Sequence, residues 1–150
     1  MQIGLFFSRF NYRTFYNVAN GAMKDDGILL LHTMGIQGTD MPVYSKWVSK
    51  YIFPNSEMPK LENLIMRAED LFVLEDLHNF GADYELTLLE WEKNLVNGWD
   101  KLKHKYSEEL LSTWLIYLHG AQGLLGGRHI HLFHFVFSKN GILGGYQAPR

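Results

Sequence analysis

The sequence of 150 residues contains no cysteine. Disulfide bonds and thiolate metal sites are therefore excluded, and the composition fits a cytoplasmic protein. No apolar run approaches the roughly 18 residues that a membrane-spanning helix needs. An excess of charge is also missing, because the formal net charge is -2. This balance offers no electrostatic basis for binding nucleic acid.

The first ten residues, MQIGLFFSRF, lack the pattern of a signal peptide, because no basic segment precedes their apolar stretch. Internal repeats and low-complexity segments are also absent. Apolar material is abundant, with 47% hydrophobic and 15% aromatic residues. A chain of this length and composition predicts one folded domain, or part of one, rather than a disordered segment.

The most informative stretch is GILLLHTMG, residues 27–35. A short apolar run bounded by turn residues is typical of a strand that is buried on both faces, as in the middle of an α/β sheet. In such sheets, functional groups collect at the carboxyl ends of the strands. His32 lies near the carboxyl end of this run. Its position alone fits both a site residue and a core histidine bonded to the backbone.

Hydrophobic spacing predicts alternating strands and helices along the chain. We expect Asn11, Asp83 and Ser107 to cap three of the helices, and the two long helices to form an antiparallel hairpin. The expected elements are strands at 3–7, 27–35, 72–77 and 130–137, short helices at 12–23, 43–53 and 60–70, and long helices at 84–106 and 108–126.

Four strands are too few for a complete doubly wound sheet. The strand at 27–35 has the composition of a central strand, yet only one expected strand precedes it. The strand at 72–77 is less apolar and is expected nearer an edge. The sequence therefore predicts the carboxyl-terminal part of a larger α/β domain.

Six motifs follow one another from Asn11 to near the end of the chain: NYRTFY at Asn11, GILLLHTMG at Gly27, KYIFPNSEMP at Lys50, EDLHNFGADYELTLLEW at Glu75, YSEEL at Tyr106 and VFSKNGILGGYQ at Val136. In this order they resemble the carboxyl-terminal part of the cyclopropane-fatty-acyl-phospholipid synthase (mycolic acid cyclopropane synthase-like) family. The resemblance implies an α/β fold of the class I S-adenosylmethionine-dependent methyltransferase (Rossmann-like) type. Residues 1–150 are then a partial methyltransferase domain, with the helical hairpin before a last strand that joins antiparallel near the sheet edge.

The resemblance also implies an activity. Enzymes of this family transfer a methylene group from S-adenosylmethionine to the cis double bond of phospholipid acyl chains. They work in the cytoplasm at the inner face of the membrane, and the full-length family implies a homodimer. The reaction passes through a carbocation that loses a proton to a bicarbonate ion. A dry, apolar pocket with one small, positioned base suits this chemistry.

Carried over by motif, three residues match the family's bicarbonate site: His32, Tyr84 and the backbone amide of Met34. His32 and Tyr84 are the expected catalytic pair. Tyr84 also begins the apolar stripe of a predicted helix, so its residue type and spacing equally fit a core tyrosine.

Several family features are missing. Where the family has a glutamate that binds bicarbonate, residues 6–10 read FFSRF, and where it has Phe-Arg-Ala-Arg, residues 125–128 read LGGR. The family's site cysteine and its glycine-rich cofactor loop have no counterpart, since the glycines at 120–127 lie in a helix and those at 141–145 have no helix after them. We therefore expect the isolated chain to be inactive, as a truncated or decayed copy or an incomplete gene model would be.

The residue pattern leaves two alternative functions open. His129, His131 and His134 suggest a metal site, but on a strand the first two share a face and the third points to the other. The sequence thus predicts no metal site there. The second alternative is a non-catalytic remnant that associates with other chains through exposed strand edges and apolar surface.

Overall fold

The computed structural model describes residues 11–38, 42–54 and 56–149, and only the backbone of residues 42–45. The strand predicted at 3–7 lies outside this range. In chain order the elements are α1 (Tyr12–Ala22), β1 (Ile28–Gly35), α2 (Pro42–Tyr51), α3 (Leu61–Met66), β2 (Val73–Asn79), α4 (Gly81–Gly98), the 3-10 turn η1 (Trp99–Lys101), α5 (Glu108–Gly126) and β3 (His131–Ser138).

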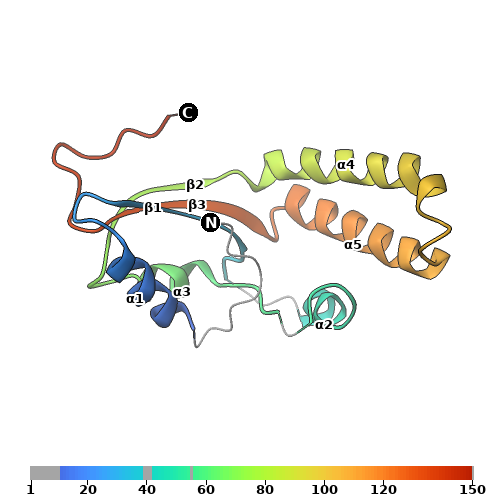
Figure 1. Ribbon diagram of the computed structural model, residues 1–150, viewed down its shortest axis with the longest axis horizontal. Helices are drawn as coiled ribbons and strands as arrows, with labels where there is room; N and C mark the ends of the chain where they lie inside the picture. Colours follow the sequence, from blue (N-terminus) through green and yellow to red (C-terminus); the bar gives the residue numbers. More distant parts are fainter. Residues whose placement is uncertain (1–10, 39–41, 55, 150) are drawn as a thin grey trace.

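The three described strands form one sheet in the order β1-β3-β2. β3 is antiparallel to both neighbours, so β1 and β2 run parallel to each other on either side of it (Figure 1). The antiparallel direction of the last strand was predicted, and among the described strands β3 lies between β1 and β2, with one strand on each side of it. All residues of β3 except His134 are buried, because the strand has a partner on each side and packing on both faces.

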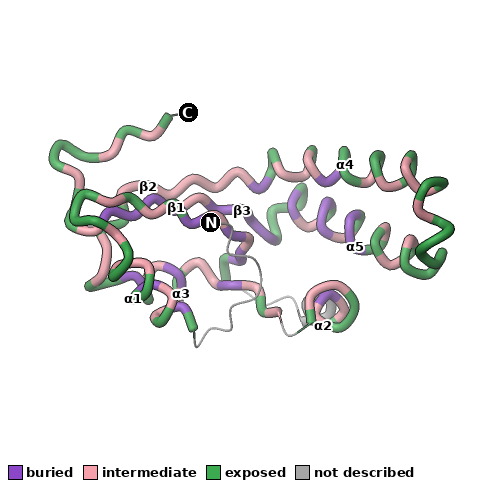
Figure 2. The backbone as a smooth tube through the Cα atoms, in the orientation of Figure 1, coloured by how far each residue is buried: buried purple, intermediate pink, exposed green. Residues whose placement is uncertain are grey.

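β1 was expected to be buried on both faces, and this was wrong. Leu31 is buried on the face covered by α1 and α3, whereas Ile28 and Leu30 on the opposite face are 53% and 50% exposed. No described helix packs over these two residues, as the green segments of β1 in Figure 2 illustrate. The apolar run therefore predicted the strand correctly and its burial only in part.

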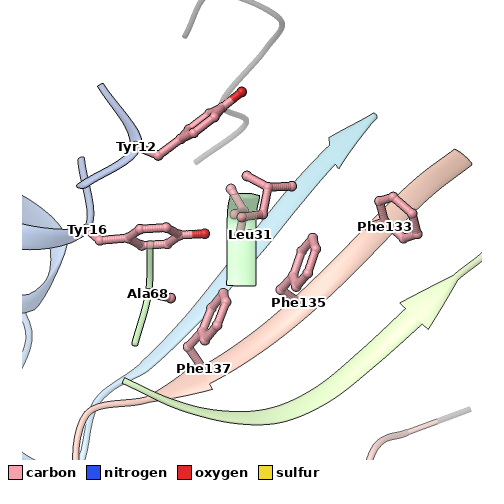
Figure 3. Close-up of a cluster of buried hydrophobic side chains, with 8 residues drawn as sticks. Tyr12, Tyr16, Leu31, Ala68, Phe133, Phe135 and Phe137 are labelled. Atoms are coloured by element: carbon pink, nitrogen blue, oxygen red, sulfur yellow. The ribbon is translucent and has the colours of Figure 1, made fainter. Parts of the chain in front are cut away.

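The covered face carries an aromatic core, drawn in Figure 3. Phe135 and Phe137 of β3 stack with their planes 4° apart and their ring centroids 5.8 Å apart. Tyr16 of α1 meets Phe137 edge-on at 5.7 Å. Leu64 and Ala68, from α3 and the turn after it, complete the cluster. Burial of these rings fixes α1 and α3 to the same face of the sheet.

The helical hairpin α4–α5 extends beyond one end of the sheet, with α2 beside it (Figure 1). Ser107 caps α5 as predicted, since its Oγ accepts a hydrogen bond from the Leu110 amide at 3.2 Å. The continuous helix predicted to Tyr106 was wrong, because α4 ends at Gly98 and turns follow. Glycine is the least favourable residue other than proline inside a helix. The spacing of the apolar residues continues past Gly98, so it did not predict this helix end.

The start of α4 differs from the prediction as well. His78 and Asn79, expected in a loop, are the last residues of β2, and α4 begins at Gly81 rather than after Asp83. The Asn79 side-chain oxygen accepts a hydrogen bond from the Gly81 amide at 3.3 Å. The Phe80 amide donates to the Leu132 carbonyl at 3.0 Å, which continues the pairing with β3 by one residue. Asn79 therefore supplies the side-chain acceptor at this helix start.

Apart from these differences, the three short helices and the hairpin were predicted correctly. Asn11 precedes α1 but makes no side-chain cap hydrogen bond. α3 is shorter than expected, because the chain turns after Met66 and Asp70 adopts a positive φ of 63°. None of the helices in the described part of the chain is long and apolar enough to span a membrane.

Phe135→Ala should lower the free energy of unfolding by about 3–5 kcal/mol, because it opens a cavity between the sheet and α1. Urea unfolding followed by circular dichroism would measure the loss. Leu143→Ala is the matched control, since Leu143 is fully exposed and should shift the unfolding free energy by less than about 0.5 kcal/mol. Equal effects of the two changes would contradict the packing described here.

Candidate functional site

Three histidines lie side by side across the sheet. His32 of β1 is directly opposite His134 of β3, and His134 is directly opposite His78 of β2. Residues directly opposite each other in antiparallel strands share a face. The three imidazoles therefore lie on the face turned away from α1 and α3, which we call the histidine face.

A β-bulge puts His78 in this row. The pairing of β2 with β3 shifts by one residue between Leu74 and Asp76, so Glu75 is the extra residue. Without this shift His78 would oppose Phe133 and point into the aromatic core. The Glu75 carboxylate accepts hydrogen bonds from the Ser138 hydroxyl at 2.6 Å and the Ile142 amide at 2.9 Å. The bulge is thus held by the end of β3 and the segment after it.

The two histidines on β1 and β3 are hydrogen bonded to each other. The distance between His32 Nδ1 and His134 Nε2 is 2.6 Å, and the ring centroids are 4.8 Å apart. The ring of Phe80 contacts all three imidazoles, with centroid distances of 5.7 Å to His32, 4.2 Å to His134 and 5.4 Å to His78. One aromatic ring therefore partly shields the polar row, whose three histidines are half-buried.

This shielding affects protonation. Burial lowers the pKa of His32. The pKa of His134 is lowered by burial first and then by the neighbouring His32 and His78. A histidine whose pKa falls below its usual value of about 6.5 is neutral at neutral pH. His32 and His134 are therefore a neutral pair that shares one hydrogen bond.

Tyr84 lies in the first turns of α4 and is half-buried. Its ring meets Trp91 edge-on at 5.9 Å. Burial raises its pKa, and burial together with the neighbouring Tyr84 raises the pKa of Tyr117 to about 12. Both hydroxyls are therefore protonated, and can donate hydrogen bonds, throughout the physiological pH range.

Of the three residues singled out from the sequence, two lie in one packing cluster, whereas His32 lies in the middle of β1 rather than at its carboxyl end. Met34 and Tyr84 pack against the same buried cluster, which includes Leu88 and Leu125 of the hairpin. His32 is linked to α4 through Phe80, whose carbonyl accepts a hydrogen bond from the Tyr84 amide at 3.3 Å. Within the described ranges, no hydrogen bond or ring contact joins His32 to Tyr84 directly. Their catalytic role stays a prediction.

Sequence reasoning missed the part that His134 and His78 play. His134 was grouped with its sequence neighbours as a metal-site alternative, and His78 was assigned to a loop. The period-two pattern of a strand reveals which residues share a face of that strand, but not which residue of another strand lies opposite.

The alternative metal site is not formed by the histidines that suggested it. His131 lies on the face opposite to His134, and its Nδ1 is 3.0 Å from the Asn79 side-chain nitrogen. His129 is exposed in the turn before β3. Throughout the described residues, no group of three or more His, Asp or Glu side chains is arranged to hold a metal ion.

Comparison with known proteins identifies the family. The model of the family described as mycolic acid cyclopropane synthetase matches residues 3–135. The chain belongs to this family. It is 39% identical over 140 residues to the cyclopropane-fatty-acyl-phospholipid synthase of Escherichia coli K12. The aligned residues make up 93% of this chain but 36% of that protein. Cyclopropane mycolic acid synthase 2 of Mycobacterium leprae is 25% identical over 141 residues, covering 85% of this chain and 46% of that protein.

Solved structures agree on the fold. Cyclopropane synthase MmaA2 of Mycobacterium tuberculosis superposes with a TM-score of 0.83 at 22% identity, covering 89% of this chain and 52% of that chain. Mycolic acid cyclopropane synthase CmaA1, complexed with SAH and CTAB, gives a TM-score of 0.82 at 21% identity, with the same coverage. The predicted fold class, part of a methyltransferase of the cyclopropane synthase type, is confirmed. The chain spans about a third of its Escherichia coli relative and about half of these two structures.

The free energy of unfolding should fall as the pH drops below about 6.5. Histidines in the unfolded chain bind protons near that pH, whereas His32, His131 and His134 have lowered pKa values in the folded chain. The unfolded state then binds more protons, so acid favours it. Urea titrations between about pH 8 and about pH 5 would measure the slope. A His134→Phe variant should show a smaller slope, and an unfolding free energy that rose on acidification would contradict the assignment.

Proposed function

We propose that a protein carrying this chain transfers a methylene group from S-adenosylmethionine to the cis double bond of phospholipid acyl chains. The observation that carries the proposal is the 39% identity to a cyclopropane-fatty-acyl-phospholipid synthase over 93% of the chain. Such a substrate lies in a membrane, so the enzyme acts at the membrane surface, and we propose its cytoplasmic side. Apolar surface that suits an acyl chain is supplied by the ring of Phe80, which packs against His32, and by the half-buried Met34 two residues further along β1.

In this proposal His32, Tyr84 and the Met34 backbone amide hold a bicarbonate ion that takes up the proton lost in the reaction. A neutral imidazole can donate through one ring N–H, and a protonated phenol through its hydroxyl. Burial keeps His32 neutral and Tyr84 protonated. A carbocation is trapped by water or by side-chain nucleophiles, so the shielding by the Phe80 ring protects the reaction.

The described residues do not fit S-adenosylmethionine itself. The cofactor supplies the methyl group and is held in this fold class by a glycine-rich loop between a strand and a helix. Among the described residues the glycines at 120–126 lie within α5, and Gly141, Gly144 and Gly145 follow the last strand without a helix after them. We therefore propose that these 150 residues alone do not bind the cofactor and are inactive.

Isothermal titration calorimetry of the 150-residue chain with S-adenosylmethionine should show no binding in the micromolar range. The full-length Escherichia coli synthase, titrated under the same conditions, is the positive control. A dissociation constant of about 1–100 μM for the chain, within the usual range of enzyme ligands, would contradict the proposed absence of a cofactor site.

A chimaera tests the activity. This chain replaces the matching segment of the Escherichia coli synthase, and methylene transfer to vesicles of cis-unsaturated phospholipid is measured. The chimaera should be active. Tyr84→Phe should slow it roughly tenfold, because one hydrogen bond worth about 1.5 kcal/mol is lost. His32→Ala should cost more, because it removes a ring as well as a donor, and added bicarbonate should partly restore either variant.

His104→Ala is the matched control, because His104 is exposed in the turn between the hairpin helices and should leave the rate unchanged. Full activity of both site variants would show that His32 and Tyr84 are ordinary core residues. An inactive chimaera that is folded would favour the second candidate, a non-catalytic chain that associates through its apolar surface. The half-exposed Ile28 and Leu30 on β1 are the observation that keeps this candidate open.

A further inference from the structure

The hydrogen bond between His32 and His134 restricts the chemistry of both rings. A neutral imidazole has one N–H and one unprotonated nitrogen. Because His32 Nδ1 and His134 Nε2 are 2.6 Å apart, one of these nitrogens must donate the proton and the other accept it. Each choice fixes which tautomer His32 adopts, and hence whether its second nitrogen, Nε2, is a donor or an acceptor.

His134 is well held for such a role. Its strand neighbours Leu132 and Val136 on the same face are buried, and Phe80 lies 4.2 Å from its ring. His78 is opposite it on the other side. With a strand on each side and an aromatic ring over it, the imidazole has little freedom to turn away from His32.

We propose that His134 is a positioning residue for His32: its Nε2–H donates to His32 Nδ1 and holds His32 in the tautomer that carries its proton on Nε2. The inference rests on the proposed function for the direction of this hydrogen bond. An anion at His32 needs a donor at Nε2, and the opposite arrangement would present it with a lone pair.

The electrostatic surroundings agree with a neutral pair. Burial lowers the pKa of both rings, and the second histidine next to each further disfavours a charge on His134. The described ionisable groups on this face are His78 and, two residues earlier on β2, Asp76. With neither ring charged at neutral pH, the shared proton alone decides the tautomer of His32.

Nuclear magnetic resonance of the 150-residue chain labelled with 15N in its histidines tests the proposal. At about pH 8, well above the usual histidine pKa, His32 Nδ1 should have the chemical shift of an unprotonated nitrogen and His32 Nε2 that of a protonated one. His134 should show the same pattern, with its proton on Nε2. A protonated His32 Nδ1 would overturn the proposal.

Two variants at one position separate positioning from packing. In His134→Gln the side-chain amide can still donate to His32 Nδ1, so the Nε2–H tautomer should persist. In His134→Phe the ring shape and strand propensity are kept but the donor is lost, so both tautomers of His32 should be populated. The exposed His104 serves as the internal reference. An unchanged His32 tautomer in His134→Phe would overturn the proposal, even if both variants fold.

The same variants in the chimaera separate this inference from the proposed function. His134→Phe should lower kcat about tenfold, the effect of losing one hydrogen bond, whereas His134→Gln should retain most of the rate. A fully active His134→Phe chimaera would overturn the positioning role and leave the proposed function intact. An inactive parent chimaera would instead refute the proposed function, and the tautomer measurement would still decide whether His134 orients His32.

Discussion

The register of β3 is the constraint on which the rest of the structure depends. This strand is the hydrogen-bonding partner of both β1 and β2, so a slip of one residue would exchange its two faces against both neighbours at once. In the observed register Phe133, Phe135 and Phe137 point toward α1 and α3, and His134 points the other way. The aromatic core therefore determines where the histidine row lies. Because the three phenylalanines of β3 point into the core, the even-numbered residues of the same strand, including His134, must point to the opposite face.

The bulge at Glu75 adds a second condition. It lets Leu77 pack into the aromatic core while His78 joins His134 on the opposite face. The carboxylate of Glu75 is tied to Ser138 and Ile142, so the end of the chain helps to hold the irregularity in place. An irregular residue in an outer strand of the described sheet thereby places His78 beside His134, in the row that includes His32, and bulges often lie near functional sites.

The candidate site spans two packing units that share Phe80. His32 belongs to the sheet, whereas Tyr84 packs with Trp91 and Tyr117 in the hairpin. Phe80 touches the histidine row and starts the helix that carries Tyr84. Small changes in the angle of α4 would therefore change the distance between the two predicted bicarbonate ligands, which makes the hairpin part of the site's geometry rather than a separate support.

The sequence by itself determined the strand at 27–35, the hairpin, the Ser107 cap and the family, because these depend on local spacing and on motifs contiguous in the chain. It also singled out His32, Met34 and Tyr84 as site residues, and that role stays a prediction. Only the tertiary structure decided that β3 is the middle strand, that one face of β1 is partly open, and that His32 is bonded to His134. These depend on pairing between residues 102 positions apart and on a bulge, and neither leaves a periodic signal in the chain.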